Sequence, residues 1–155
     1  MLRHLDHKSA QSNCGSTLSE IPPALFLLIF VAVFPVVNFI IMGLTYCSCT
    51  LLNNLELREA ARTPNSQLAP VIASVQQKWQ STTLGQLTGL ASPPLADVTY
   101  STNGSDTYVT VSTVFTAKSF FNIPFFKGVP GLGGTWTYKI AGNSVLEDPS
   151  YASFN

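Results

Sequence analysis

A lone carboxylate stands immediately before a long apolar run near the start of the chain. Glu20 lies five positions after Gly15, and no Asp, Glu, Lys or Arg occurs between Ile21 and Asn54. Intramembrane acids are costly and need a partner. Cleavage between Gly15 and Ser16 would create an amine on Ser16, one helical turn from Glu20, where opposite charges can meet. A cut at that point would therefore supply the missing cation for Glu20, from the same subunit or from a neighbour.

Two other interpretations of Glu20 stay open at this point. The simpler one is an interfacial acid at a helix N-terminus, where the helix dipole favours negative charge. In the other, a pair formed between subunits would set the registration of packed helices.

Enzymatic chemistry finds little support in the remaining residues. His4 and His7, the two histidines, both lie in the polar leader, which argues against a Ser-His or Cys-His nucleophile and against a His-ligated metal in the mature protein. The later acids are scattered over predicted turns and strand ends rather than paired for general acid and base work; they are Asp97, Asp106, Glu147 and Asp148. We expect a protein that is not an enzyme, with no cofactor, metal or small-molecule substrate.

Composition points to a membrane protein. Charged residues make up 10% of the chain, against about 25% in typical soluble domains. Net charge is zero and no basic cluster occurs, which excludes a typical nucleic-acid binder. Residues 24–44 match the roughly 20 apolar residues that a membrane-spanning helix needs. We therefore predict a single-pass protein in contact with membrane lipid.

The membrane helix is expected to extend well beyond the bilayer. Leucines continue the helical spacing as far as Arg62, and Glu59 is expected to pair with Arg62 one turn later. Pro64 ends the pattern. Such a helix would be about 60 Å long, twice the apolar thickness of a membrane. Pro35 is expected to bend it. Cys47 and Cys49 point to different faces, which is poor geometry for a shared metal or bond. They are interpreted as buried apolar thiols at the membrane edge, in preference to a redox or lipid-attachment role.

The second half of the chain predicts a helix followed by strands. A second helix is expected over residues 70–80, with Val71, Val75 and Trp79 on one stripe. Residues 97–102 and 107–117 alternate like paired strands around a hairpin loop of about four residues at Asn103, where a turn explains the Asn-Gly pair better than glycosylation does. Residues 135–141 predict a third strand.

A loop rich in phenylalanine, proline and glycine joins the last two strands. Phe120, Phe121, Phe125 and Phe126 fall within seven positions. They either form core beneath the sheet or an exposed patch that meets a partner or the bilayer, and core is the preferred interpretation.

The expected fold class is α+β: a long N-terminal transmembrane helix, a second short helix, and a small antiparallel sheet of about three strands covered on one face by that second helix. The domain organisation follows from these elements. We expect residues 1–15 to form a polar leader, residues 16–64 the membrane helix and its extension, and residues 65–155 a small α+β domain.

Two segments together resemble the TadE-like minor pilins, or pseudopilins, of the Tad (Flp) pilus system. The first is "GSTLSEIPPALFLLIF", which resembles a type IV prepilin processing site followed by a membrane helix. The second is "LELREAARTP", which is similar to the family's helix-end motif and contains Arg58, Glu59, Ala60, Ala61 and Arg62. Ser19 and Ile21 replace the Val and Phe that usually flank the family's glutamate, and Pro22 and Pro23 come early.

The resemblance implies a structural role in pilus biogenesis. A prepilin peptidase would cut between Gly15 and Ser16, and Glu20 would serve recognition or assembly. The partners implied are other Tad pilus subunits and assembly proteins. The implied location is the bacterial inner membrane, with a cytoplasmic leader and an exported C-terminal domain, before any incorporation into a pilus. The alternative is an unprocessed, signal-anchored protein whose exported domain binds a partner.

Overall fold

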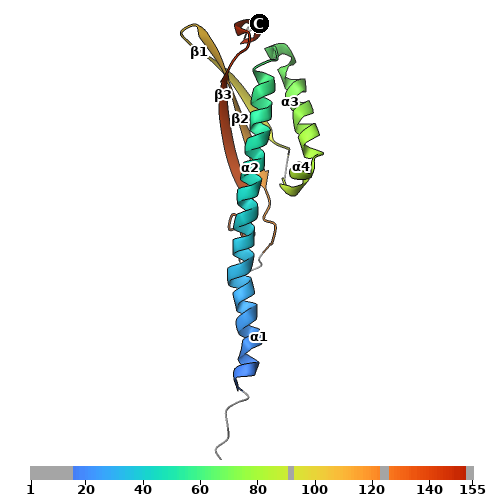
Figure 1. The fold of residues 1–155 in the computed structure, drawn as a ribbon, viewed down its shortest axis with the longest axis vertical. Coiled ribbons are helices and arrows are strands. Elements are labelled where there is room, and N and C mark those ends of the chain that lie inside the picture. The colour runs from blue at the N-terminus through green and yellow to red at the C-terminus, as the bar shows by residue number, and fades with distance from the viewer. Residues whose placement is uncertain (1–15, 91–92, 123–125, 153–155) are drawn as a thin grey trace, which may run out of the picture.

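The computed structural model of the protein describes residues 16–90, 93–122 and 126–152, with side chains from Ile21 onward. Three segments follow one another without a break: α1 (Ser16–Leu28), a π-helical turn η1 (Ile29–Val33) and α2 (Phe34–Ala60). They form one long rod that projects from a small folded domain (Figure 1). The predicted single long helix is thus confirmed, and it ends two residues before the expected Arg62.

The π turn explains how the rod passes Pro35. A proline inside an α-helix lacks a donor, and its ring meets the carbonyl four residues earlier. Here the Phe34 N–H donates to the carbonyl of Ile29, five residues back. This wider turn lies immediately before Pro35 and takes up the disturbance, so helix α2 continues beyond it.

Two helices follow the rod. Helix α3 (Asn65–Gln80) begins five residues earlier than predicted, and Pro70 lies inside it. The missing Pro70 donor leaves only the carbonyl of Ser66 without a helical partner, and Ser66 is exposed to solvent. The short helix α4 (Thr83–Leu87) was not predicted. Its first turn is capped by the Thr82 hydroxyl, which accepts from the Gly85 N–H at 3.1 Å.

A three-stranded antiparallel sheet completes the fold and confirms the predicted α+β class. Strands β1 (Leu95–Asn103), β2 (Asp106–Ala117) and β3 (Trp136–Val145) lie in the order β1-β2-β3. Asn103 pairs with Asp106, so the first hairpin turn is tighter than the four residues expected. Gly104 takes φ +67°, a conformation that glycine adopts without steric cost.

The sheet packs mainly on α2, not on the second helix as predicted. Helix α2 contacts β2 and β3, and α3 packs against α2 and shares a core cluster with Val109 and Val111 of β2 (Figure 1). From α3, Leu68, Ile72 and Trp79 reach the core, so the buried stripe includes Trp79 but not Val71. Strand β2 supplies alternating buried side chains, among them Val109, Val111, Thr113, Phe115 and Ala117.

The end of the described chain also contributes to this core. A short helix η3 (Pro149–Ala152) follows β3. Ala152 is buried with Leu146, Ala60 and Ala61.

Candidate functional site along the long helix

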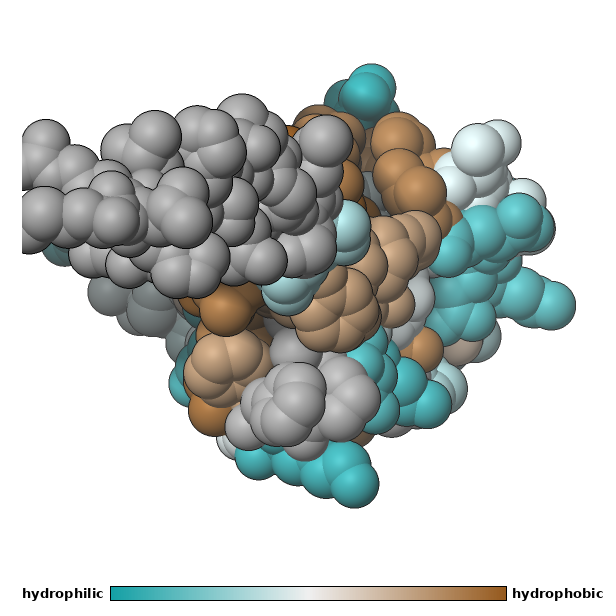
Figure 2. All heavy atoms as spheres, turned by 90° about the horizontal axis from the view of Figure 1, so that it is seen from below, coloured by the Kyte–Doolittle hydropathy of each residue, from teal (hydrophilic) through white to brown (hydrophobic). Residues whose placement is uncertain are grey.

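The first half of the rod presents apolar side chains to its surroundings. Most large residues from Ile21 to Val37 are exposed, and helix Ile21–Ala60 is long and apolar enough to cross a membrane. It is the one such helix in the described part of the chain. Viewed from this end, hydrophobic surface gathers near the axis of the molecule and polar residues lie towards its periphery (Figure 2). This segment is a candidate membrane anchor.

The predicted processing site lies at the free end of the rod. Gly15 lies outside the described residues, Ser16 is the first residue of α1, and Glu20 lies one turn further along the same helix. Pro22 and Pro23 lie inside α1 and do not end it. The backbone therefore places Ser16 and Glu20 at the i, i+4 spacing on which the predicted pairing depends; the pairing itself stays a prediction.

A clamp holds the loop between β2 and β3 onto the rod. The buried Asn38 amide donates to the carbonyl of Phe121 at 3.0 Å and accepts from the Phe121 N–H at 2.9 Å. The ring of Phe121 stacks on Phe34, with centroids 5.0 Å apart. The Tyr138 hydroxyl donates to the carbonyl of Met42 at 3.0 Å. Asn38 therefore satisfies its polar groups inside an apolar stretch, where an unpaired amide is costly.

The loop itself is compact because glycines and one carbonyl organise it. The Val129 carbonyl accepts from the N–H groups of Leu132, Gly133 and Gly134 at 3.1, 3.1 and 2.9 Å. Gly131 takes φ +82° and lies against Met42 of the rod. The preferred interpretation of its phenylalanines as core is wrong for Phe120, which is 60% exposed, and for Phe126. Phe125 lies outside the described residues.

A buried polar network joins the second half of the rod to the sheet. The Glu56 carboxylate accepts from the Thr113 hydroxyl at 2.5 Å and from the Gln76 amide at 2.7 Å. Asn53 donates to the Thr113 hydroxyl at 3.0 Å and to the Val111 carbonyl at 3.2 Å. Glu56 lies well beyond residues 24–44, in the folded domain; burial raises the pKa of its carboxyl, and the two hydrogen bonds oppose that rise.

The centre of the network is closed to solvent. Glu56 and Asn53 are fully or almost fully buried between α3 and the sheet. Among the described residues no group of three or more His, Cys, Asp or Glu side chains is placed to hold a metal ion. Directional hydrogen bonds of this kind fix how the rod lies against the sheet.

The predicted helix-end motif lies where the rod meets the end of β3. Ala60 and Ala61 are buried in the core, where a larger side chain would not fit between α2 and α3. The Glu147 N–H donates to the carbonyl of Ala61 at 3.1 Å. Arg62 pairs with the carboxylate of Glu147 at 2.6 Å, so the expected partnership with Glu59 is wrong. Arg58 is exposed and forms no ion pair with any described residue.

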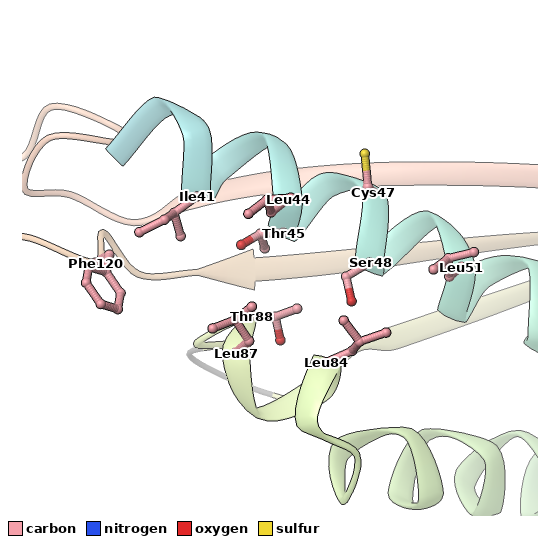
Figure 3. A pocket seen from close by; sticks show the side chains of 10 residues that line it. All are labelled: Ile41, Leu44, Thr45, Cys47, Ser48, Leu51, Leu84, Leu87, Thr88 and Phe120. Carbon is pink, nitrogen blue, oxygen red and sulfur yellow. The ribbon is translucent and has the colours of Figure 1, made fainter. Parts of the chain in front are cut away.

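An apolar groove of about 270 Å³ runs between the rod and α4. Figure 3 shows Leu84 and Leu87 of α4, and Thr88 directly after it, facing the rod, with Phe120 at one end. The buried Ser48 hydroxyl points towards α4 and has no hydrogen-bond partner among the described residues. The remaining residues that line the groove also come from the rod: Ile41, Leu44, Thr45, Cys47 and Leu51.

The two helix cysteines lie on different faces, as predicted. Cys47 is exposed beside the groove, and its thiol points away from α4 (Figure 3). Cys49 is completely buried with Leu52, Trp79 and Phe115. The interpretation of both as buried thiols is thus right for Cys49 alone.

Three polar residues that organise the site were missed from the sequence. Asn38, Asn53 and Glu56 all interrupt the apolar pattern of the rod. A polar residue in such a run needs a partner and is therefore a signal in its own right. The signal indicates a partner but not its identity, because Phe121 and Thr113 lie far away in the sequence.

Comparisons with known proteins give no relative from which to transfer a function. No protein-family model, curated protein or solved structure matches the chain significantly.

Proposed function

We propose that the protein is a TadE-like minor pilin, a membrane-anchored structural protein for biogenesis of a Tad (Flp) type IV pilus or a related secretion filament. The observation that carries the proposal is the single rod from Ser16 to Ala60. The side chains of its first half are apolar and exposed, and its second half is the central helix of the folded domain. A subunit built in this way stays in the membrane until assembly and presents its domain on one side.

In this proposal a prepilin peptidase cuts between Gly15 and Ser16 and removes the polar leader. Glu20 then lies one turn from the new amine, of its own chain or of a neighbouring subunit. The leader is cytoplasmic and the domain is exported. The helix-end motif supports the domain, since Ala60 and Ala61 belong to its core. Other Tad pilus subunits and assembly proteins are the partners.

The amino terminus of the protein purified from its native membrane tests the processing step. We expect an intact mass and terminal sequence that start at Ser16, with or without a methyl group. A start at Met1 or Leu2, in a host with a working prepilin peptidase, would overturn the proposal.

Substitution of Glu20 tests the assembly step. Glu20→Ala is expected to abolish co-purification with other pilus subunits while membrane insertion stays intact. Asp97→Ala removes an exposed carboxylate on β1 and is the matched control. In this variant, co-purification with pilus subunits and membrane insertion should both be unchanged. Normal pilus assembly in the Glu20→Ala strain would count strongly against the role.

A second candidate is an unprocessed, signal-anchored protein whose exported domain binds a partner. The exposed Phe120 at the end of the groove favours it. It predicts that the leader stays attached and that Gly15→Ala has no effect, whereas the minor pilin requires Gly15 for cleavage.

A further inference from the structure

The loop between β2 and β3 lies beside the part of the rod that is apolar enough to cross a membrane. The apolar core of a bilayer takes about 20 helical residues. A span of that length that begins at Ile21, directly after the last charged residue, ends near Ile40. Phe34 and Asn38, which hold Phe121, lie within it. The clamp therefore keeps the loop at the depth where the helix leaves the hydrocarbon.

Three apolar side chains of this loop are exposed. Phe120, Phe126 and Val129 are exposed by 60, 37 and 42% of their surfaces. Two exposed lysines, Lys118 and Lys127, accompany them in the sequence. Apolar side chains next to lysines are typical of segments that lie in the interface of a bilayer, where the amines meet anionic headgroups.

Aromatic residues occupy the next level along the rod. Tyr46 of α2 and Tyr138 of β3 contact each other edge to face, with ring centroids 5.4 Å apart. Tyr46 is about half exposed and lies roughly two turns beyond Asn38. Tyrosines gather at the headgroup level of membrane proteins, because one end of the ring is apolar and the other is polar. Along the rod, the phenylalanines of the loop therefore lie nearer the hydrocarbon and the tyrosines nearer the headgroups. This is the order expected at the surface of a membrane.

We propose that Phe120, Phe126 and Val129 form a membrane-docking surface: they enter the bilayer beside the folded domain, and the Asn38 clamp fixes their depth. The occupant of the surface is the lipid that surrounds the rod. Docking would set the height of the domain above the bilayer and restrict its tilt. The inference rests on the membrane-spanning role of the rod but not on pilus assembly.

Site-directed spin labelling of the full chain in vesicles of phosphatidylcholine and phosphatidylglycerol tests the proposal. Cys47→Ser removes the exposed thiol, Cys14→Ser removes the thiol that lies outside the described residues, and Cys49 stays because it is buried. Single labels are then placed by Phe120→Cys and Phe126→Cys. Leu28→Cys in the exposed part of α1 is the lipid control, and Val145→Cys at the far end of β3 is the aqueous control.

We expect the ratio of oxygen to water-soluble nickel relaxation at positions 120 and 126 to rise well above that at 145, towards that at 28. A high ratio at 28 with low ratios at 120 and 126 would overturn docking and leave the anchor intact. Low relaxation by both reagents at 120 would also overturn it, because protein would then cover the loop. A low ratio at 28 would refute the membrane placement itself.

Discussion

The rod before Asn38 and the rod after it have opposite surroundings. In the first half, large side chains such as Leu25, Phe26 and Leu28 face outwards and are more than half exposed. In the second half, Leu52 and Glu56 are completely buried between α3 and the sheet. One continuous helix is thus both a candidate lipid anchor and the centre of a protein core.

The difference shows what polar residues contribute to such a helix. Apolar contacts alone are non-directional and allow a helix to slide along a sheet. Asn38, Asn53 and Glu56 form hydrogen bonds to specific partners on the loop and on β2, and these fix the register. The first half has no such residue between Ile21 and Val37, as expected of a surface that meets fluid lipid.

Adjacent leucines give the strongest test of this contrast. Leu52→Ala removes a completely buried side chain and is expected to lower the free energy of unfolding by about 2–5 kcal/mol. Leu51→Ala, at a position 54% exposed, should change it by less than about 0.5 kcal/mol. Urea unfolding of the full chain in detergent micelles, followed by tryptophan fluorescence, measures both. Equal losses would contradict the register of α2 on the sheet.

Glu56 tests the buried network. Glu56→Ala leaves the Thr113 hydroxyl and the Gln76 amide without their acceptor and is expected to cost about 1–3 kcal/mol. Because the folded-state pKa of Glu56 is raised, the folded protein holds its proton more tightly than the unfolded chain. Stability should therefore fall as pH rises from the usual pKa of 4.5 to the raised value, and stay level above it.

Glu56→Gln provides the control for this pH effect, because it keeps the shape and cannot ionise. The same unfolding measurements at a series of pH values should show a smaller decline for Glu56→Gln than for the wild type. Parallel curves for the two proteins would show that the Glu56 pKa is not raised.

Gly142 on β3 tests how closely the rod lies on the sheet. A Cβ atom there would be 3.0 Å from Leu57 and 3.2 Å from the Asn53 amide oxygen. Gly142→Val is therefore expected to destabilise the domain by about 1–3 kcal/mol through overpacking. Asn143→Val, at the exposed neighbouring position, should stay within about 0.5 kcal/mol. Thermal unfolding by circular dichroism compares them, and similar melting temperatures would argue against this close packing.

The smallest effect is expected at the exposed ion pair that ends the rod. Arg62→Ala removes the pair with Glu147, both side chains of which are about half exposed, and should cost no more than about 1 kcal/mol. The difference should shrink at high salt. Arg58→Ala removes an exposed arginine without an ion pair among the described residues and serves as the control. A loss at Arg62 that is independent of salt would indicate a role in packing instead.

Regular patterns in the sequence predicted most elements but not how they meet. The long helix, the hairpin and the third strand follow from apolar runs and from alternation, and all three are present. The start of α3 was misjudged because Pro70 suggested a first turn, yet the helix tolerates it. The phenylalanine loop was assigned to the core because composition does not distinguish a buried aromatic residue from one that faces lipid.

The sequence by itself determined that a long uncharged helix follows Glu20 and that strands follow later, because periodicity and charge are local properties of the chain. Only the tertiary structure decided at which residue other segments of the protein begin to pack against that helix. The position of that residue depends on contacts between residues that are far apart in the sequence, such as Asn38 with Phe121 and Glu56 with Thr113. Whether an apolar face meets lipid or protein is settled by which distant segment folds back onto it, and no local pattern records that.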